Sequence, residues 1–172
     1  MNYADIIFND FTAGDGVSLS FFTQGCERRC KDCHNPETWD FEGGKPFNQE
    51  VINKVIAGLH ANGVSRNLAI MGGEPFHKRN RGVLIGLWSA VKKASPNTPI
   101  YIWTGYTLEE LVDMNIPTID IILQSIDYLI DGPYIRELKD VTLKWRGSSN
   151  QRIFDKSQII SYYKKKREAG DN

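Results

Sequence analysis

Short apolar runs alternate with helical patterns along most of this chain. Residues 17–23 and 67–71 are rich in β-branched and other apolar side chains, which predicts two strands. A helix is expected between them over residues 49–60, behind an N-cap at Asn48. Its apolar positions recur at helical spacing: Val51, Ile52, Val55, Ile56 and Leu59.

The same alternation continues toward the carboxyl end. Thr107 and Glu110 have the spacing of a capping box, which predicts the start of a short helix. Residues 119–123 form an apolar run that fits either a strand or a helix. The other expected elements are a helix around 84–91, strands over 99–104 and 128–131, and a last helix over 157–166.

Strands that alternate with helices favour a mostly parallel sheet with right-handed crossovers. A complete eight-unit barrel needs about 250 residues, and this chain has 172. We therefore expect one α/β domain over residues 1–172, built as an incomplete, open TIM-like barrel of about five or six βα units. A helical tail is expected from about residue 157. In such folds the functional side chains gather where the strands end.

Composition and charge exclude several classes of protein. The chain is 41% hydrophobic and 24% charged, as ordinary globular proteins are. Its 21 basic and 21 acidic residues cancel, so no net field favours nucleic acid or an anionic membrane. No apolar run approaches the ~20 residues of a transmembrane helix, and residues 1–10 lack the basic start of a secretory signal. We expect a cytoplasmic protein.

The three cysteines of the chain lie within eight positions, directly after the first predicted strand. They are Cys26, Cys30 and Cys33. An odd, clustered set does not form a disulfide framework, and thiolates are soft ligands that suit iron–sulfur clusters or zinc. A cubane cluster usually takes four cysteines. With three from this chain, one iron stays open to a ligand from outside the protein.

A structural zinc ion is the alternative for this loop. Zinc takes four ligands, and His34 follows Cys33 directly, but neighbouring residues bind one ion with difficulty and no second ligand pair exists. A non-enzymatic zinc or iron–sulfur module therefore stays open as a second class of function.

A glycine-rich turn follows the strand expected over 67–71. It reads Gly72, Gly73, Glu74 and Pro75. Two glycines allow the main chain to approach a ligand closely, and the main-chain carbonyls and the Glu74 carboxylate can accept hydrogen bonds from a cation. A plain tight turn with a surface glutamate is the competing interpretation.

The cysteine loop and the glycine turn together resemble the radical S-adenosylmethionine (SAM) superfamily. The resemblance implies one [4Fe-4S] cluster on the three cysteines, with SAM chelating the open iron and its ammonium held by Gly72, Gly73 and Glu74. Reductive cleavage of SAM then yields a 5′-deoxyadenosyl radical. Many members have an aromatic residue where this chain has Asp32. The main chain at Asp32, Cys33 and His34 is still expected to lie against the adenine.

Several further segments resemble glycyl-radical-enzyme activases, and among them those of anaerobic ribonucleoside-triphosphate reductases. The segments are 15–16, 33–39, 103–106, 131–134 and 146–152. The resemblance implies that the large subunit of such a reductase is the partner, that one of its glycines becomes a radical, and that a low-potential donor such as flavodoxin supplies electrons. Thr104 and Asp131 are expected to line the cofactor, and the segment 146–152 is a hypothetical partner contact. An activase of another glycyl radical enzyme, or another small radical SAM enzyme, is the close alternative.

Overall fold

The computed structural model of the chain describes residues 1–170, so the last two residues of the expected tail lie outside the described part. Its strands are β1 (Asn2–Asp10), β2 (Ser18–Thr23), β3 (Lys45–Pro46), β4 (Asn67–Gly72), β5 (Ile100–Trp103), β6 (Tyr128–Asp131) and β7 (Arg152–Asp155). Its helices are α1 (Gln49–Leu59), α2 (Arg81–Ala94), α3 (Leu108–Asp113), α4 (Pro117–Ser125) and α5 (Lys156–Gly170). Single 3₁₀ turns are η1 (Pro36–Thr38), η2 (Ala61–Gly63) and η3 (Arg136–Leu138).

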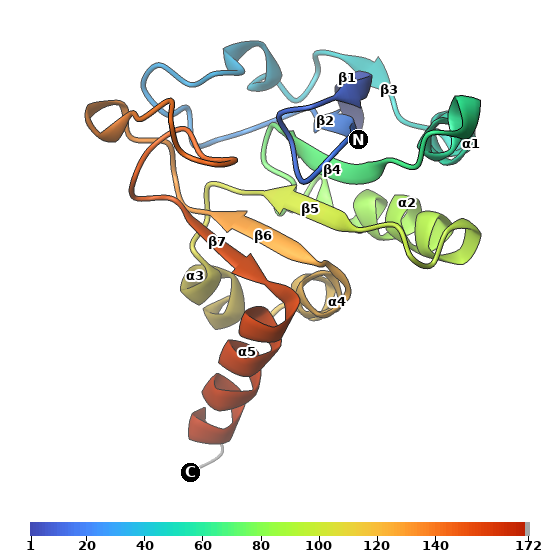
Figure 1. Cartoon of the computed structure of the whole chain (residues 1–172). Coiled ribbons are helices and arrows are strands. Elements are labelled where there is room, and N and C mark those ends of the chain that lie inside the picture. The colour runs from blue at the N-terminus through green and yellow to red at the C-terminus, as the bar shows by residue number, and fades with distance from the viewer. Residues whose placement is uncertain (171–172) are drawn as a thin grey trace.

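Within residues 1–170 the seven strands form one mixed sheet in the order β3-β1-β2-β4-β5-β6-β7 (Figure 1). The strands β2, β4, β5 and β6 are parallel neighbours, and helices connect each of them to the next. The α/β class is therefore confirmed, and the sheet is not closed. A TIM-like curvature stays a prediction.

The expected five or six βα units are too many, because the described chain has four parallel strands. Both flanks of the parallel part are antiparallel: β1 pairs with β2, and β7 pairs with β6. Antiparallel neighbours can be joined without a helical crossover. The connection from β1 to β2 is a short loop, and the connection from β6 to β7 is a long loop that contains the turn η3 and an isolated antiparallel bridge between Lys139 and Ser148.

Local sequence signals predicted the starts of α1, α3 and α5 to within one residue. The Asn48 side chain accepts a hydrogen bond from the Val51 N–H at 3.2 Å, and Thr107 with Glu110 forms the complete capping box before α3. The ambiguous run 119–123 is helical, because Pro117 starts α4 at a position where its missing N–H costs nothing. No helix within residues 1–170 is long and apolar enough to cross a membrane.

The hydrophobic core lies between the parallel strands and the helices α1, α2 and α4. Side chains such as Leu19, Val55, Leu68, Leu87 and Ile122 are 0–1% exposed. The carboxyl ends of β5 and β6 point toward the segment after β2 and toward the long loop before β7 (Figure 1). The core thus holds one edge of the sheet in place, and the loops that carry the predicted chemistry all leave from that edge.

Arg66 is a buried charged residue that joins three parts of the chain ahead of β4. Its side chain is 5% exposed. The guanidinium donates hydrogen bonds of 2.6–3.1 Å to the oxygens of Phe8, Asn9, Gly58, Ala61 and Val64. These acceptors lie at the end of β1, at the end of α1 and in the turn that follows α1, so Arg66 joins these segments through their main-chain carbonyls and the Asn9 side chain.

Replacing Arg66 by Met should lower the free energy of unfolding by about 3 kcal/mol, because several buried carbonyls would lose their donor. The Lys45→Met substitution is the control, since Lys45 pairs with Asp5 at 3.8 Å with both side chains more than 60% exposed. That change should cost less than about 0.5 kcal/mol. Urea unfolding of both variants checks this, and equal losses would contradict the role given to Arg66.

Candidate functional site

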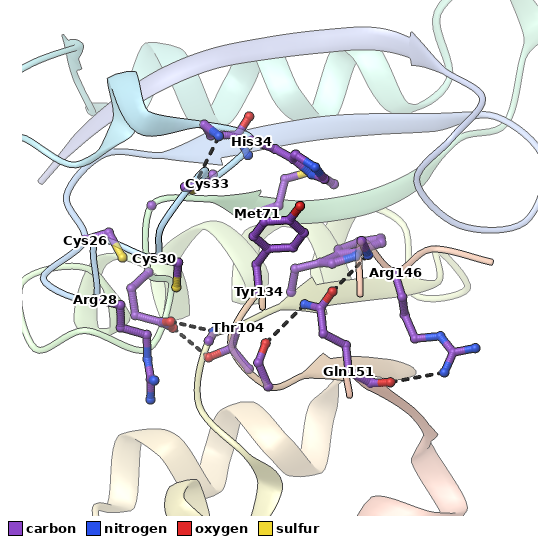
Figure 2. Close-up of a pocket in the computed structure, with 18 of the residues that line it drawn as sticks. Cys26, Arg28, Cys30, Cys33, His34, Met71, Thr104, Tyr134, Arg146 and Gln151 are labelled. Atoms are coloured by element: carbon purple, nitrogen blue, oxygen red, sulfur yellow. Dashed lines mark hydrogen bonds between the residues drawn. The ribbon is translucent and has the colours of Figure 1, made fainter. Parts of the chain in front are cut away.

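A cavity of about 430 Å³ lies at the carboxyl ends of the four parallel strands (Figure 2). All three cysteines line it, together with three further elements of the prediction. These are His34 after the cysteines, the turn Gly72–Glu74 after β4, and Thr104 after β5. Segments far apart in the sequence thus meet in one place, as expected where parallel strands end.

The cysteine loop turns sharply between its thiols. Arg29 has φ +46° and Asp32 has φ +55°, so a left-handed residue stands between each pair of successive cysteines. The Cys33 N–H donates to the Cys30 carbonyl at 3.1 Å, and the Asn35 N–H lies 3.4 Å from the Cys33 Sγ. With these bends in the loop, all three cysteines line the same cavity.

The donor set fits a cluster better than a single ion. No group of three or more His, Cys, Asp or Glu side chains in residues 1–170 converges closely enough to hold one metal ion. Ligands of one zinc ion all lie about 2.0–2.3 Å from it, whereas a cubane places each thiolate on a different iron. Burial is the main cause that raises the pKa of the Cys26 thiol, so metal binding there would release a proton.

The glycine turn is attached to the main chain immediately before Cys26. The Gly73 N–H donates to the Thr23 carbonyl at 2.8 Å, and the Glu74 N–H donates to the Gly25 carbonyl at 2.9 Å. A Cβ added to Gly73 would lie 2.6 Å from the Gly25 oxygen. Only glycine permits this approach, so Gly73 is required by packing as well as by any ligand.

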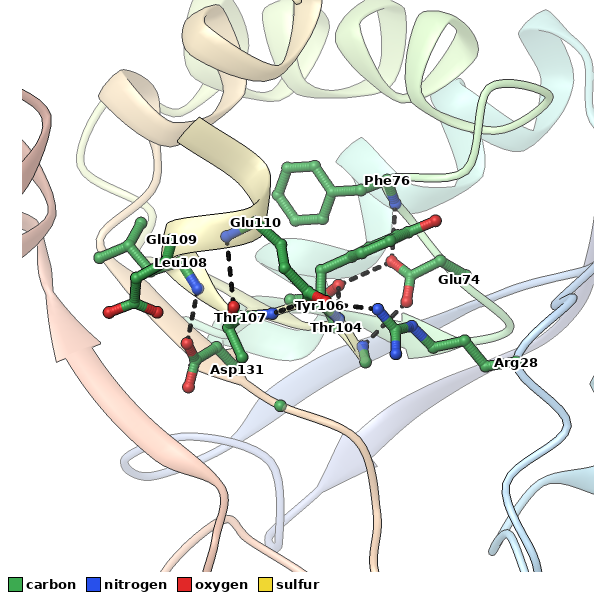
Figure 3. Close-up of polar contacts among 12 residues, drawn as sticks. Arg28, Glu74, Phe76, Thr104, Tyr106, Thr107, Leu108, Glu109, Glu110 and Asp131 are labelled. Atoms are coloured by element: carbon green, nitrogen blue, oxygen red, sulfur yellow. Dashed lines mark hydrogen bonds and ion pairs between the residues drawn. The ribbon is translucent and has the colours of Figure 1, made fainter. Parts of the chain in front are cut away.

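Glu74 is a buried carboxylate held by three donors (Figure 3). Its Oε1 accepts from the Phe76 N–H at 3.0 Å and from the Thr104 hydroxyl at 2.8 Å, and its Oε2 accepts from the Gly105 N–H at 2.8 Å. Burial is the main cause that raises the pKa of Glu74, and these hydrogen bonds oppose it. A carboxylate offers about four acceptor positions, so capacity remains for one more donor in the cavity.

Two of the predicted site residues do not line the cavity. Asp32 is exposed, and its carboxylate forms an ion pair with Arg136 at 2.6 Å. Asp131 is fully buried, and it accepts hydrogen bonds from the Leu108 N–H at 2.7 Å and from Arg152 at 2.5 and 3.0 Å. Their direct contact with a cofactor stays a prediction; in the structure both carboxylates are bound by the protein itself.

The structure adds cavity residues that the sequence patterns did not single out as ligands. Among them are Arg28, Met71, Tyr134, Trp145 and Gln151. Gln151 accepts from the Gly147 N–H at 2.9 Å and donates to the Gly132 carbonyl at 3.1 Å, so it folds the segment 146–152 back over the end of β6. Met71 directly precedes the glycine turn, and Tyr134 lies in the segment 131–134 that carries the resemblance, so both could have been included on position. Trp145 had no such signal.

Comparison with known proteins agrees with this geometry. A family model for a 4Fe-4S single cluster domain matches residues 12–154. The anaerobic ribonucleoside-triphosphate reductase-activating protein of Vibrio cholerae is 39% identical over 154 residues, covering 89% of this chain and 97% of that protein. This chain belongs to the family of anaerobic ribonucleoside-triphosphate reductase-activating proteins. The family members of Pasteurella multocida and Escherichia coli are 36% and 34% identical over 90% and 88% of the chain, and 97% and 96% of their own lengths are covered.

The contacts of Asp131 predict a structural effect of its substitution in this activating-protein fold. The hydrogen bonds that Arg152 donates to Asp131 and to Glu109 raise the pKa of Arg152, and the bonds donated to Glu109 lower the pKa of Glu109. Asp131→Asn should lower the free energy of unfolding by about 2 kcal/mol, because a buried acceptor becomes a donor facing other donors. Glu109→Gln is the control; Glu109 is 42% exposed, and the loss there should stay below about 1 kcal/mol. Denaturant unfolding of the apo-proteins measures the free energy of unfolding of both variants. An Asp131→Asn protein with an unchanged free energy of unfolding would contradict the structural role of Asp131.

Proposed function

We propose that this protein activates an anaerobic ribonucleoside-triphosphate reductase by reductive cleavage of SAM at a [4Fe-4S] cluster, leaving a glycyl radical on the large subunit of the reductase. The observation that carries the proposal is that Cys26, Cys30, Cys33 and the turn Gly72–Glu74 line one cavity. Membership in the activating-protein family supports the choice of partner.

The three cysteines would hold the cluster through their thiolates, each on a different iron. When bound, the reduced cluster supplies the electron that splits SAM into methionine and the 5′-deoxyadenosyl radical, which takes hydrogen from a glycine. The protein contributes binding, orientation and exclusion of side reactions to this chemistry. No side-chain acid or base is required by the proposal.

Glu74 would accept a hydrogen bond from the methionyl ammonium, with the carbonyls of Gly72 and Gly73 as further acceptors. The hydrogen bonds from Thr104 and Gly105 keep the Glu74 carboxylate in one orientation toward the cavity. His34 lines the cavity with its ring 4.8 Å from that of Tyr134, and these residues would border the adenine. The main chain at Asp32 would still border the adenine, since only the carboxylate of Asp32 is engaged, by Arg136. Asp131 would contribute to the cofactor site with its carboxylate bound by Arg152.

An open sheet suits a macromolecular substrate, because the glycine belongs to a loop of another protein. The segment 146–152 supplies Arg146, Gly147 and Gln151 to the cavity lining, which supports its role as a contact for that loop. The proposal includes an incomplete barrel within one domain, a cytoplasmic location, and a low-potential carrier such as flavodoxin as the electron donor.

Reconstitution with the partner tests the proposal directly. The iron-loaded protein, SAM, a reductant and the anaerobic reductase should give a glycyl radical signal by electron paramagnetic resonance (EPR), with 5′-deoxyadenosine as product. SAM cleavage without a radical on the reductase would reject the partner and favour another activase or small radical SAM enzyme. One bound zinc per chain and no response to SAM would favour the metal-binding module.

Substituting Cys30→Ala should abolish both cluster retention and SAM cleavage, because two thiolates do not anchor a cubane. Lys31→Ala is the matched control, since Lys31 is the exposed neighbour of Cys30 in the same loop. That variant should keep four irons per chain. Iron analysis and product chromatography measure both effects, and a Cys30→Ala protein with retained activity would refute the ligand assignment.

Substituting Glu74→Gln should raise the Kd for SAM by about 10- to 100-fold, since a hydrogen bond to a charged group is worth roughly 1.5–3 kcal/mol. In the unsubstituted protein the affinity should increase as the pH rises through the raised pKa of Glu74, because the carboxyl gains its negative charge there. The Gln variant should lack this pH dependence. Calorimetric titration with SAM at several pH values measures the Kd. Glu42→Gln is the control, because the Glu42 side chain is 77% exposed and does not line the cavity.

A further inference from the structure

Arg28 is a charged residue of the cavity lining that lies between Cys26 and Cys30 in the chain. Its side chain leaves the cysteine loop and reaches the turn between β5 and α3 (Figure 3). The guanidinium carbon lies 4.1 Å from the centroid of the Tyr106 ring, and Nη2 lies 3.4 Å from the Glu110 Oε2. The side chain is 24% exposed, so one arginine joins the cysteine loop to α3 through a ring and a carboxylate.

The Nε atom of Arg28 is buried and makes no hydrogen bond within the described residues. A buried donor without an acceptor is costly, so such an atom calls for an explanation. The atom lies beside Gly105, where an added Cβ would come within 2.8 Å of it. Gly105 itself lines the cavity and donates to Glu74. The unpaired donor is thus located at the cavity, next to the residues proposed to hold SAM.

The neighbouring arginine is placed differently, although it carries the same charge. Arg29 is exposed, and the left-handed backbone at φ +46° turns it away from the first cavity. It lines a separate cavity of about 450 Å³ on the other side of Cys26, together with Trp39 and Phe41. Two adjacent guanidinium groups of one loop therefore differ in burial, in contacts and in the cavity that they face.

We propose that Arg28 is a positioning residue that holds the cysteine loop against the β5–α3 turn, with its positive charge stabilising the reduced form of the cluster. The inference rests on the proposed function. The step concerned is the uptake of one electron from the low-potential donor, which makes the cluster more negative by one charge. No proton moves at Arg28, because a guanidinium keeps its charge at every relevant pH.

A nearby positive charge favours the more negative of two redox states, and its effect is larger where water is excluded. Two carboxylates near Arg28 oppose this effect. Glu110 is 52% exposed, so solvent screens its charge. Glu74 is buried, and hydrogen bonds from Phe76, Thr104 and Gly105 already stabilise its carboxylate. The positive charge of Arg28 is therefore only partly cancelled at the cavity.

The test compares Arg28→Gln with Arg29→Gln, which remove the same charge from adjacent positions of the loop. Each full-length protein is reconstituted with iron and sulfide, and the midpoint potential is measured by EPR-monitored titration without SAM or reductase. Arg28→Gln should shift the reduction equilibrium at least tenfold toward the oxidised form, which is 59 mV for one electron. Arg29→Gln should shift it less than threefold, and Arg28→Lys should recover most of the loss. Equal shifts in the two Gln variants, or none, would overturn the proposal.

A second variant covers the case in which Arg28→Gln fails to retain four irons. Tyr106→Leu removes the ring under the guanidinium without changing any charge, so Arg28 would be less firmly held. The midpoint potential of the cluster in that variant should be lower than in the unsubstituted protein, by less than in Arg28→Gln. An unchanged midpoint potential would reject the role of Arg28. Failure of the proposed function gives a different result from failure of the role of Arg28, because the unsubstituted protein would then hold a cluster but not cleave SAM.

Discussion

The site depends on the close approach of two main-chain segments, Gly73 against Gly25. Parallel pairing of β2 with β4 brings Thr23 opposite Gly72, and the hydrogen bonds at Gly73 and Glu74 continue this pairing past the ends of both strands. The contact leaves no room for a Cβ on Gly73. Because Cys26 follows Gly25 directly, the position of the first cysteine and that of the glycine turn are determined together.

Glu74 extends this contact to a third strand. Its carboxylate joins the turn after β4 to Thr104 and Gly105 after β5, in a place where water has little access. A buried carboxylate is stable there only because donors surround it on both oxygens. The same residue therefore fixes the spacing of two strand ends and presents an acceptor to the cavity.

Much of the architecture was predictable from local signals. The Asn48 cap, the Thr107–Glu110 capping box and the apolar runs of β2, β4, β5 and β6 each specify an element through a few neighbouring residues. The antiparallel strands β1 and β7 were not predicted. β7 has four half-buried residues and lies at the edge of the sheet, so it lacks both the alternation and the continuous apolar run that mark a strand.

The sequence by itself indicated an iron–sulfur domain, because three clustered thiols directly after a strand are a local pattern. It also indicated the family, which the related activating proteins confirm.

Only the tertiary structure decided which charged residues face the cavity. Arg28 and Arg29 are neighbours, yet one is held by Tyr106 and Glu110 and the other is exposed. Asp131 ends a strand as predicted, yet Arg152 engages its carboxylate. Partners more than 20 residues away in the chain fix these orientations, and no local pattern encodes them.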